Sequence, residues 1–468
     1  MNYPRIIIAG VRGGSGKTTV SLSLTASLRS HCNLKVVPYK KGPDYIDAGW
    51  LSLAAKRPCY NLDPFLVAKD EVARSFVAHF EGDMAVIEGN RGLFDGMDVE
   101  GSFSTAELAK LLNAPVILVV DCTKMTRTSA AVIQGLMSFD KGLGIKGVVL
   151  NQLAGARHES IIRQSVEKYC SVAVVGAIPR LKAGEMPERH MGLTPYQEHE
   201  NTTGVISFAK GLGEKYLDLT AIVAIAESAG PLTLIATTID RDKSAASASV
   251  VRIGVFRDAA FQFYYPENFE ELRRLGAEIV EIDAIDGGSL PEVDALYIGG
   301  GFPETNALKL AENTSFREHV KSAAEKGLPI YAECGGLMFL GDAIIMNGQR
   351  YPMAGVFPLV FDMKPKPQAH GYTIVDVVGE NPFYPEGTVL HGHEFHYSSV
   401  VEIRDPEGYR LAFSMKRGKG IGEQADGICY KNVLATYTHV HALGTPGWAR
   451  GLIDKAKEYK EKNDKIHA

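Results

Sequence analysis

A glycine-rich loop near the start of the chain has the composition of a phosphate-binding site. The segment GVRGGSGKTT begins at Gly10 and lies between an apolar β-branched run and a stretch of helical character. Glycines let backbone N–H groups converge on phosphate oxygens, while a lysine reaches the β- and γ-phosphates and a threonine hydroxyl ligates Mg²⁺. The strict P-loop pattern requires glycine at position 11, where this chain has Val11, so the loop is a variant. We expect ATP to bind at Gly13, Gly14, Ser15, Gly16, Lys17, Thr18 and Thr19.

Acidic residues follow the next two apolar runs. Asp44 and Asp47 lie in KKGPDYID, and Glu88 ends the next run, with Asp95 a short distance beyond it. Mg²⁺ takes oxygen ligands, usually one or two carboxylates beside phosphate and water. We therefore expect Thr18, Asp44 and Glu88 to bind Mg²⁺. For Asp47 and Asp95 a substrate role and a turn or helix-cap role are both open.

A cysteine in the second half has the setting of a nucleophile. Cys334 stands between the apolar run LPIYAE and two glycines, at a predicted strand-to-helix turn. There a helix N-terminus and a neighbouring imidazole would lower the pKa of the thiol. His439 and His441 are the candidate partners, and they would face the same side of a strand. Backbone N–H groups at Gly300 and Gly301 would supply an oxyanion hole.

The remaining cysteines and a histidine cluster carry weaker signals. No CxxC pair occurs, so we expect the other five cysteines to be structural. The segment HGHEFHYS holds three histidines without the HExxH spacing, which favours a substrate-facing or structural role over a zinc site.

The elements that position these motifs form two α/β patterns. Apolar runs without polar alternation indicate parallel strands covered on both faces, and ligands of such sheets bind beyond the carboxyl ends of the strands. A Ser/Ala-rich stretch separates the two patterns. The fold class is therefore α/β with two α/β domains. We expect a P-loop domain over residues 1–225, a linker over 226–250, a thiol domain over 251–447 and a solvated helical tail over 448–468.

The composition narrows the class of protein further. A net charge of −5 argues against a nucleic-acid partner. No apolar run approaches about 18 residues and the first residues lack a secretory signal, so we expect no membrane partner. Widely separated cysteines fit reduced thiols and a cytoplasmic location.

The motifs together resemble the cobyrinate a,c-diamide synthase family of cobalamin biosynthesis. They occur between residues 10 and 441 in the order GGSGKTT, KKGPDYID, IEGNRGLFDG, PERHMGL, YYPEN, GGGFPE, YAECGGLM, HGHEFHYS and THVH. The first half is similar to dethiobiotin synthetase and MinD-type ATPases, and the second resembles class I glutamine amidotransferases. Cobyric acid synthases share the two-domain plan but usually have a different loop around the cysteine.

The resemblance implies a fold and an activity. It implies a dethiobiotin synthetase-like doubly wound parallel sheet followed by a class I glutamine amidotransferase-like domain. Glutamine would be hydrolysed at Cys334, and ATP would phosphorylate a corrinoid carboxylate that ammonia then amidates, at the a- and c-acetate groups in turn. The family favours His439 as the partner of Cys334. The usual glutamate position two residues later is His441 here, which implies a Cys–His dyad.

The expected ligands are a corrinoid, glutamine and ATP as co-substrate, with Mg²⁺ as cofactor, and a homodimer is compatible with the sequence. Substrate or intermediate contacts are expected from Asp47, Asp95, Arg189 and His190, and the cations that would attract substrate carboxylates also include Lys40, Lys41 and Arg91. Two alternatives stay open: the same chemistry on hydrogenobyrinate or nickel-sirohydrochlorin, and a partitioning-type regulatory ATPase.

Overall fold

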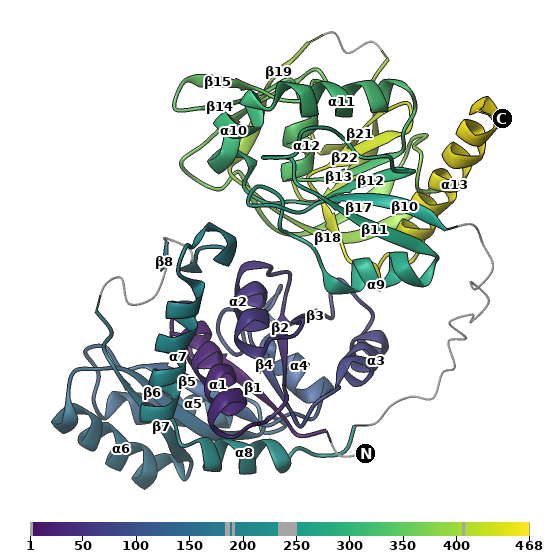
Figure 1. Ribbon diagram of the computed structural model, residues 1–468. Coiled ribbons are helices and arrows are strands. Elements are labelled where there is room, and N and C mark those ends of the chain that lie inside the picture. Colours follow the sequence, from purple (N-terminus) through teal and green to yellow (C-terminus); the bar gives the residue numbers. More distant parts are fainter. Residues whose placement is uncertain (1–2, 183–187, 190–191, 233–249, 405–407, 468) are drawn as a thin grey trace. The chain divides into compact units, whose positions relative to one another are not determined.

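The computed structural model describes residues 3–182, 188–189, 192–232, 250–404 and 408–467 (Figure 1). The chain divides into two compact units: unit 1 is Met1–Pro64 with Ala68–Thr237, and unit 2 is Phe65–Val67 with Thr238–Ala468. Both are α/β, as predicted. Most of the expected linker, residues 233–249, lies outside the described residues.

Unit 1 is built on a parallel sheet. Within its described residues seven strands pair in the order β3-β2-β4-β1-β5-β6-β7, and every neighbouring pair is parallel. Ile6, Ile7 and Ile8 are all fully buried, because helices cover both faces of the sheet. The strands are β1 (Arg5–Gly10), β2 (Val36–Lys41), β3 (Tyr60–Leu62), β4 (Met84–Glu88), β5 (Val116–Asp121), β6 (Ile145–Leu153) and β7 (Ala173–Pro179). The helices are α1 (Lys17–His31), α2 (Ile46–Ala55), α3 (Lys69–His79), α4 (Thr105–Leu111), α5 (Thr128–Phe139), α6 (Ala156–Cys170), α7 (Thr202–Tyr216) and α8 (Leu219–Glu227).

The strand order of unit 1 brings three predicted motifs together at the carboxyl ends of its central strands. Strands β2, β4 and β1 are neighbours, so the segments after them leave the sheet side by side. Lys40 of β2 is in register with Glu88 of β4, and Glu88 is in register with Ile8 of β1. The phosphate loop and the two acidic motifs therefore meet at the carboxyl ends of these strands.

Unit 2 contains a mixed sheet of ten strands in the order β11-β10-β12-β13-β22-β21-β20-β17-β18-β23 among its described residues. The pairs from β11 to β22 are parallel and those from β22 to β23 are antiparallel. A smaller sheet has the order β15-β14-β16-β19. The large sheet comprises β10 (Val251–Phe256), β11 (Ala277–Ile282), β12 (Ala295–Ile298), β13 (Ile330–Glu333), β17 (Ala369–Val377), β18 (Val389–His396), β20 (Arg410–Arg417), β21 (Ala425–Tyr430), β22 (Val433–Thr436) and β23 (His439–Val440). The small sheet comprises β14 (Ala343–Met346), β15 (Gln349–Pro352), β16 (Leu359–Met363) and β19 (Ser398–Ile403), and the helices are α9 (Pro266–Arg274), α10 (Ala307–Glu312), α11 (Thr314–Glu325), α12 (Gly335–Leu340) and α13 (Gly447–His467).

The C-terminal helix α13 differs from the solvated tail that we expected. Trp448, Leu452 and Ala456 are fully buried and recur every four residues, so they share one face of the helix. This face packs into the same apolar cluster as Val251 and Tyr297 of the large sheet. The ribbon of α13 lies beside β10 (Figure 1). The many lysines and glutamates of the segment obscured this apolar stripe. None of the described helices is long and apolar enough to cross a membrane.

Candidate active sites

The phosphate loop of unit 1 connects β1 to α1. Gly16 precedes the helix with φ 91°, a left-handed conformation that favours glycine. A Cβ at Gly16 would lie 2.1 Å from Nδ2 of Asn151, which donates a hydrogen bond to the carbonyl oxygen of Ser15 (2.9 Å). Gly13 and Gly14 are exposed at the tip of the loop. Asn151, at the end of β6, therefore fixes the loop from behind, a role that a single strand-end asparagine does not reveal in sequence.

The first turn of α1 carries the lysine and the two threonines of the phosphate-binding motif. Lys17 is 8% exposed, and its Nζ donates a hydrogen bond to the carbonyl oxygen of Arg91 (2.7 Å). Burial and the charge of Lys40 lower the pKa of Lys17. Thr18 donates from Oγ1 to Oε1 of Glu88 at 2.8 Å, and Thr19 is buried. Thr18 thus contacts the last residue of β4, and Lys17 contacts the segment that follows this strand.

A cluster of three carboxylates surrounds the buried ammonium group of Lys40. Its Nζ lies 2.7 Å from Oδ2 of Asp47, 2.9 Å from Oε1 of Glu88 and 3.5 Å from Oδ2 of Asp44. Thr18 Oγ1 also reaches Oδ2 of Asp47, at 3.3 Å. We expected Lys40 to attract substrate. With a side chain only 2% exposed, it is instead an internal counter-ion of this cluster.

The two aspartates of KKGPDYID both lie near Lys40 but differ in their contacts. Asp44 accepts a hydrogen bond from the backbone N–H of Asp47 through Oδ1 (2.9 Å), a turn contact just before α2, whose N-cap residue is Tyr45. Asp47 points to Thr18 and Lys40. Asp95 accepts a hydrogen bond from the N–H of Gly92 (2.8 Å), so it has a turn contact.

The electrostatics of the cluster favour a cation. Burial raises the pKa of Glu88, and burial together with the charge of Asp47 raises that of Asp44 to about 7. Burial also opposes ionisation of Asp47, but Lys40 outweighs it and lowers the pKa of Asp47. Burial opposes the charge of Lys40 as well, yet the carboxylates raise its pKa far above the usual value.

The residues of this cluster fit Mg²⁺ when a nucleotide supplies further ligands. Oε2 of Glu88 is buried and has no hydrogen-bond partner among the described residues. With Thr18 and Asp47 it offers the hard oxygens that Mg²⁺ prefers. No group of three or more His, Cys, Asp or Glu in the described ranges could hold a metal by itself. Arg189 lies in the short strand β8 (Glu188–Arg189), and His190 lies outside the described residues.

Cys334 of unit 2 occupies the sharp turn between β13 and α12. Its φ of 47° and ψ of −97° depart from both strand and helix geometry. The two glycines that follow are required by close packing, since a Cβ on Gly335 would lie 3.0 Å from the backbone nitrogen of Gly301. A Cβ on Gly336 would lie 2.5 Å from the carbonyl oxygen of Ile298. The predicted strand, turn and helix are therefore present at this cysteine.

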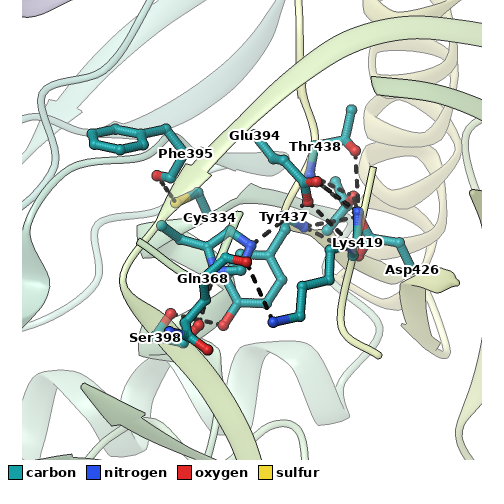
Figure 2. A network of polar contacts seen from close by, with 12 residues as sticks. Cys334, Gln368, Glu394, Phe395, Ser398, Lys419, Asp426, Tyr437 and Thr438 are labelled. Atoms are coloured by element: carbon teal, nitrogen blue, oxygen red, sulfur yellow. Dashed lines mark hydrogen bonds and ion pairs between the residues drawn. The ribbon is translucent and has the colours of Figure 1, made fainter. Parts of the chain in front are cut away.

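The thiol of Cys334 lies in a buried and negatively charged environment. The residue is 4% exposed, and its Sγ donates to the carbonyl oxygen of Phe395 at 3.8 Å (Figure 2). Burial raises the pKa of this thiol, and nearby Glu304, Glu333 and Glu394 raise it further. Burial and these carboxylates therefore outweigh the lowering of the thiol pKa that we expected from the helix N-terminus. A base must therefore take the proton when the sulfur attacks.

His439 belongs to the same site as Cys334. It lies on β23, and its Nδ1 is 3.5 Å from Oε2 of Glu333, the residue before the cysteine. A Cβ on Gly300 would lie 2.4 Å from Cε1 of His439, so the imidazole packs directly against this glycine. Gly301 in turn packs against Gly335. The expected histidine and the glycine pair are thus gathered around the cysteine turn.

His441 belongs to a separate pair. Its Nδ1 accepts a hydrogen bond from the N–H of Leu443 (3.2 Å), and its Nε2 lies 3.5 Å from Oε1 of Glu267. The described contacts of both ring nitrogens are therefore with Leu443 and Glu267. We expected His439 and His441 to face the same side of one strand. This does not apply, because β23 ends at Val440 and His441 lies beyond it.

The HGHEFHYS segment forms a polar network on β18 (Figure 2). Glu394 accepts hydrogen bonds from the backbone N–H groups of Lys419 (2.6 Å) and Gly420 (3.0 Å), and His396 Nε2 lies 3.6 Å from its Oε2. The ring of His396 stacks on Tyr437 with centroids 3.7 Å apart. The described contacts of Glu394 and His396 are those of a polar network within unit 2.

A buried carboxylate fixes the segment that leads to His439. Asp426 accepts hydrogen bonds from the hydroxyl of Thr436 (2.6 Å) and from the backbone N–H groups of Tyr437 and Thr438 (Figure 2). It is fully buried. Asp426 was not predicted, because nothing near it in sequence distinguishes it from a surface turn residue.

Comparisons with known proteins assign a domain family to most of each unit. Residues 6–193 match the CobQ/CobB/MinD/ParA nucleotide binding domain, and residues 252–446 match the CobB/CobQ-like glutamine amidotransferase domain. The protein is thus a nucleotide-binding domain joined to a glutamine amidotransferase domain.

Relatives match nearly the whole chain. The cobyrinate a,c-diamide synthase of Magnetococcus marinus is 44% identical over 453 residues, which cover 95% of this chain and 96% of the relative. That of Archaeoglobus fulgidus is 39% identical over 462 residues, covering 98% and 99%. The chain belongs to the cobyrinate a,c-diamide synthase family, as the motifs predicted, and it is a glutamine-hydrolysing, ATP-dependent ligase.

Proposed function

We propose that the protein converts cobyrinate to cobyrinate a,c-diamide in cobalamin biosynthesis, with nitrogen from glutamine and activation by ATP. Relatives that carry this name span nearly the full length of the chain. The observation that carries the proposal is that each unit gathers its own set of predicted site residues. Thr18, Glu88 and Lys17 meet in unit 1, and the Cys334 turn packs beside His439 in unit 2.

Unit 1 would activate the substrate carboxylate. Hydroxide is a poor leaving group, so the carboxylate attacks the γ-phosphorus of ATP, ADP departs, and an acyl phosphate forms. Ammonia then adds to the acyl carbon and expels phosphate. Lys17 would hold the β- and γ-phosphates. Thr18 and Glu88 would hold Mg²⁺, with Asp47 better placed than Asp44, and the bound metal would neutralise phosphate charge.

Unit 2 would supply the ammonia. Sγ of Cys334 attacks the carboxamide carbon of glutamine while His439 takes the thiol proton. His439 returns a proton to the departing ammonia, and water hydrolyses the remaining thioester to glutamate. N–H groups of the Gly300–Gly301 segment would stabilise the oxyanion.

A substrate panel tests the proposal. Each amidation replaces a hydroxyl by an amino group, so mass spectrometry after incubation with ATP, Mg²⁺ and glutamine counts the amides formed. We expect two amides on cobyrinate. Two amides on hydrogenobyrinate or nickel-sirohydrochlorin, with none on cobyrinate, would keep the chemistry and change the substrate.

Two variants test the assignment of the sites. Lys17→Ala should abolish amidation with either glutamine or ammonium salts, because the activation step is lost. Cys334→Ala should abolish amidation with glutamine and retain it with ammonium salts. Glutamine-driven turnover by Cys334→Ala would overturn the thiol assignment.

A further inference from the structure

Two buried carboxylates each face one histidine near the cysteine turn. Glu333 Oε2 lies 3.5 Å from Nδ1 of His439, and Glu267 Oε1 lies 3.5 Å from Nε2 of His441. All four side chains are at most 2% exposed. The Glu333–His439 and Glu267–His441 pairs therefore match in distance and in burial, but they contain different histidines.

The carboxylate of Glu333 is fixed through both oxygens. Oε1 accepts a hydrogen bond from the backbone N–H of Val440 (3.1 Å), the residue after His439. Oε2 accepts one from the hydroxyl of Tyr297 (3.3 Å). Burial and the charge of Glu333 raise the pKa of Tyr297 far above its usual value, so this hydroxyl stays a donor. Glu333 thus holds the backbone of β23 and also faces the imidazole that this strand carries.

We propose that Glu333 is the positioning residue of His439, the third member of the glutamine-hydrolysing group. This inference rests on the proposed roles of Cys334 and His439. A carboxylate opposite Nδ1 keeps the proton on that nitrogen, leaves Nε2 as the basic nitrogen, and stabilises the imidazolium formed when the thiol proton is taken. Because Glu333 directly precedes Cys334, one strand end supplies both the nucleophile and the group that orients its base.

The other histidine in contact with His439 does not take this role. The ring of His393 on β18 stacks on His439 with centroids 4.8 Å apart. Burial and the neighbouring histidines, His439, His370 and His441, lower the pKa of His393 far below its usual value. His393 therefore stays neutral, so the carboxylate of Glu333 is the charge directly opposite the imidazole.

Glu333→Gln tests the proposal, with Glu267→Gln as the matched control. The readout is glutamate release from glutamine by the full-length protein, with kcat and KM determined across pH. We expect Glu333→Gln to lower kcat by about 10²-fold or more with KM little changed, in line with loss of an orienting carboxylate in a triad. The acidic limb of its pH profile should move to lower pH, because the imidazolium loses its counter-charge. Glu267→Gln should keep kcat within a few-fold and leave the limb in place.

Additional variants distinguish a failure of the proposed Glu333 role from misfolding and from a failure of the thiol site. Wild-type kcat in Glu333→Gln, or an equal loss in both variants, would overturn the positioning role. If Glu333→Gln does not fold, Glu333→Asp decides: a lowered kcat with an unmoved acidic limb supports the role, and wild-type kcat overturns it. Cys334→Ala is measured in parallel. Glutamate release by that variant would refute the thiol site itself, independently of Glu333.

Discussion

Nζ of Lys40 lies 2.9 Å from Oε1 of Glu88, and the two residues are in register on adjacent parallel strands. The ammonium group therefore occupies the centre of the carboxylate cluster that we assign to Mg²⁺. Removal of one partner of a buried ion pair leaves an uncompensated charge, which typically costs about 3–5 kcal/mol.

Lys40→Met should therefore destabilise unit 1 in the absence of ligands. We expect a loss of about 3 kcal/mol or more in the free energy of unfolding, measured by urea denaturation, with much of it recovered in Mg²⁺ and ADP because the metal supplies the missing charge. Lys110→Met is the control, since Lys110 forms an exposed pair with Asp140 that contributes about 1 kcal/mol at most. Equal unfolding free energies for the two variants would contradict the role of Lys40.

The geometry of the aspartates predicts which of them serves the metal. Asp47→Asn should raise the Mg²⁺ concentration for half-maximal ammonia-driven amidation by about tenfold, because Asp47 lies within 3.3 Å of the hydroxyl of Thr18. Asp44→Asn should raise this Mg²⁺ concentration less, since Oδ1 of Asp44 accepts a hydrogen bond from the backbone N–H of Asp47 and no contact with Thr18 is recorded for it among the described residues. A larger effect at Asp44 would restore the assignment made from sequence.

Close packing at Gly300 predicts a selective loss of function. Gly300→Ala would place a methyl group 2.4 Å from Cε1 of His439, so the ring must shift. Glutamine-driven amidation should fall by about 10²-fold while ammonia-driven amidation persists, since a displacement of about 1 Å at a catalytic group has this effect. Gly288→Ala is the control, because a Cβ there meets nothing within 4 Å. Full glutamine-driven activity in Gly300→Ala would place the base elsewhere.

The buried thiol predicts slow chemical modification. Burial and three carboxylates raise the pKa of Cys334, so little thiolate is present near neutral pH. Alkylation by iodoacetamide, followed at each cysteine by peptide mass spectrometry, should be slower at Cys334 than at the partly exposed Cys32 at pH 7. The rate at Cys334 should keep rising with pH beyond the usual thiol range. Faster reaction at Cys334 than at Cys32 would contradict this environment.

The sequence predicted the architecture because its signals are local and repeated. Apolar runs and the GKTT and CGG turns each act within about ten residues, so the α/β class, the phosphate loop and the turn at Cys334 could be predicted. The choice between Asp44 and Asp47 depends on where α2 begins, and that between His439 and His441 depends on the end of β23 at Val440. The roles of Lys40, Asn151, Asp426 and Glu333 depend on partners in other elements or loops of the fold, which local sequence patterns do not reveal.

The order of events during synthesis follows from the position of β23. Glu333 and Val440 are 107 residues apart in the sequence. A ribosome-bound chain therefore carries its sulfur long before it acquires the imidazole. Under the proposed roles, a nascent or prematurely terminated polypeptide that lacks β23 could not hydrolyse glutamine, although the residues of unit 1 are already synthesised.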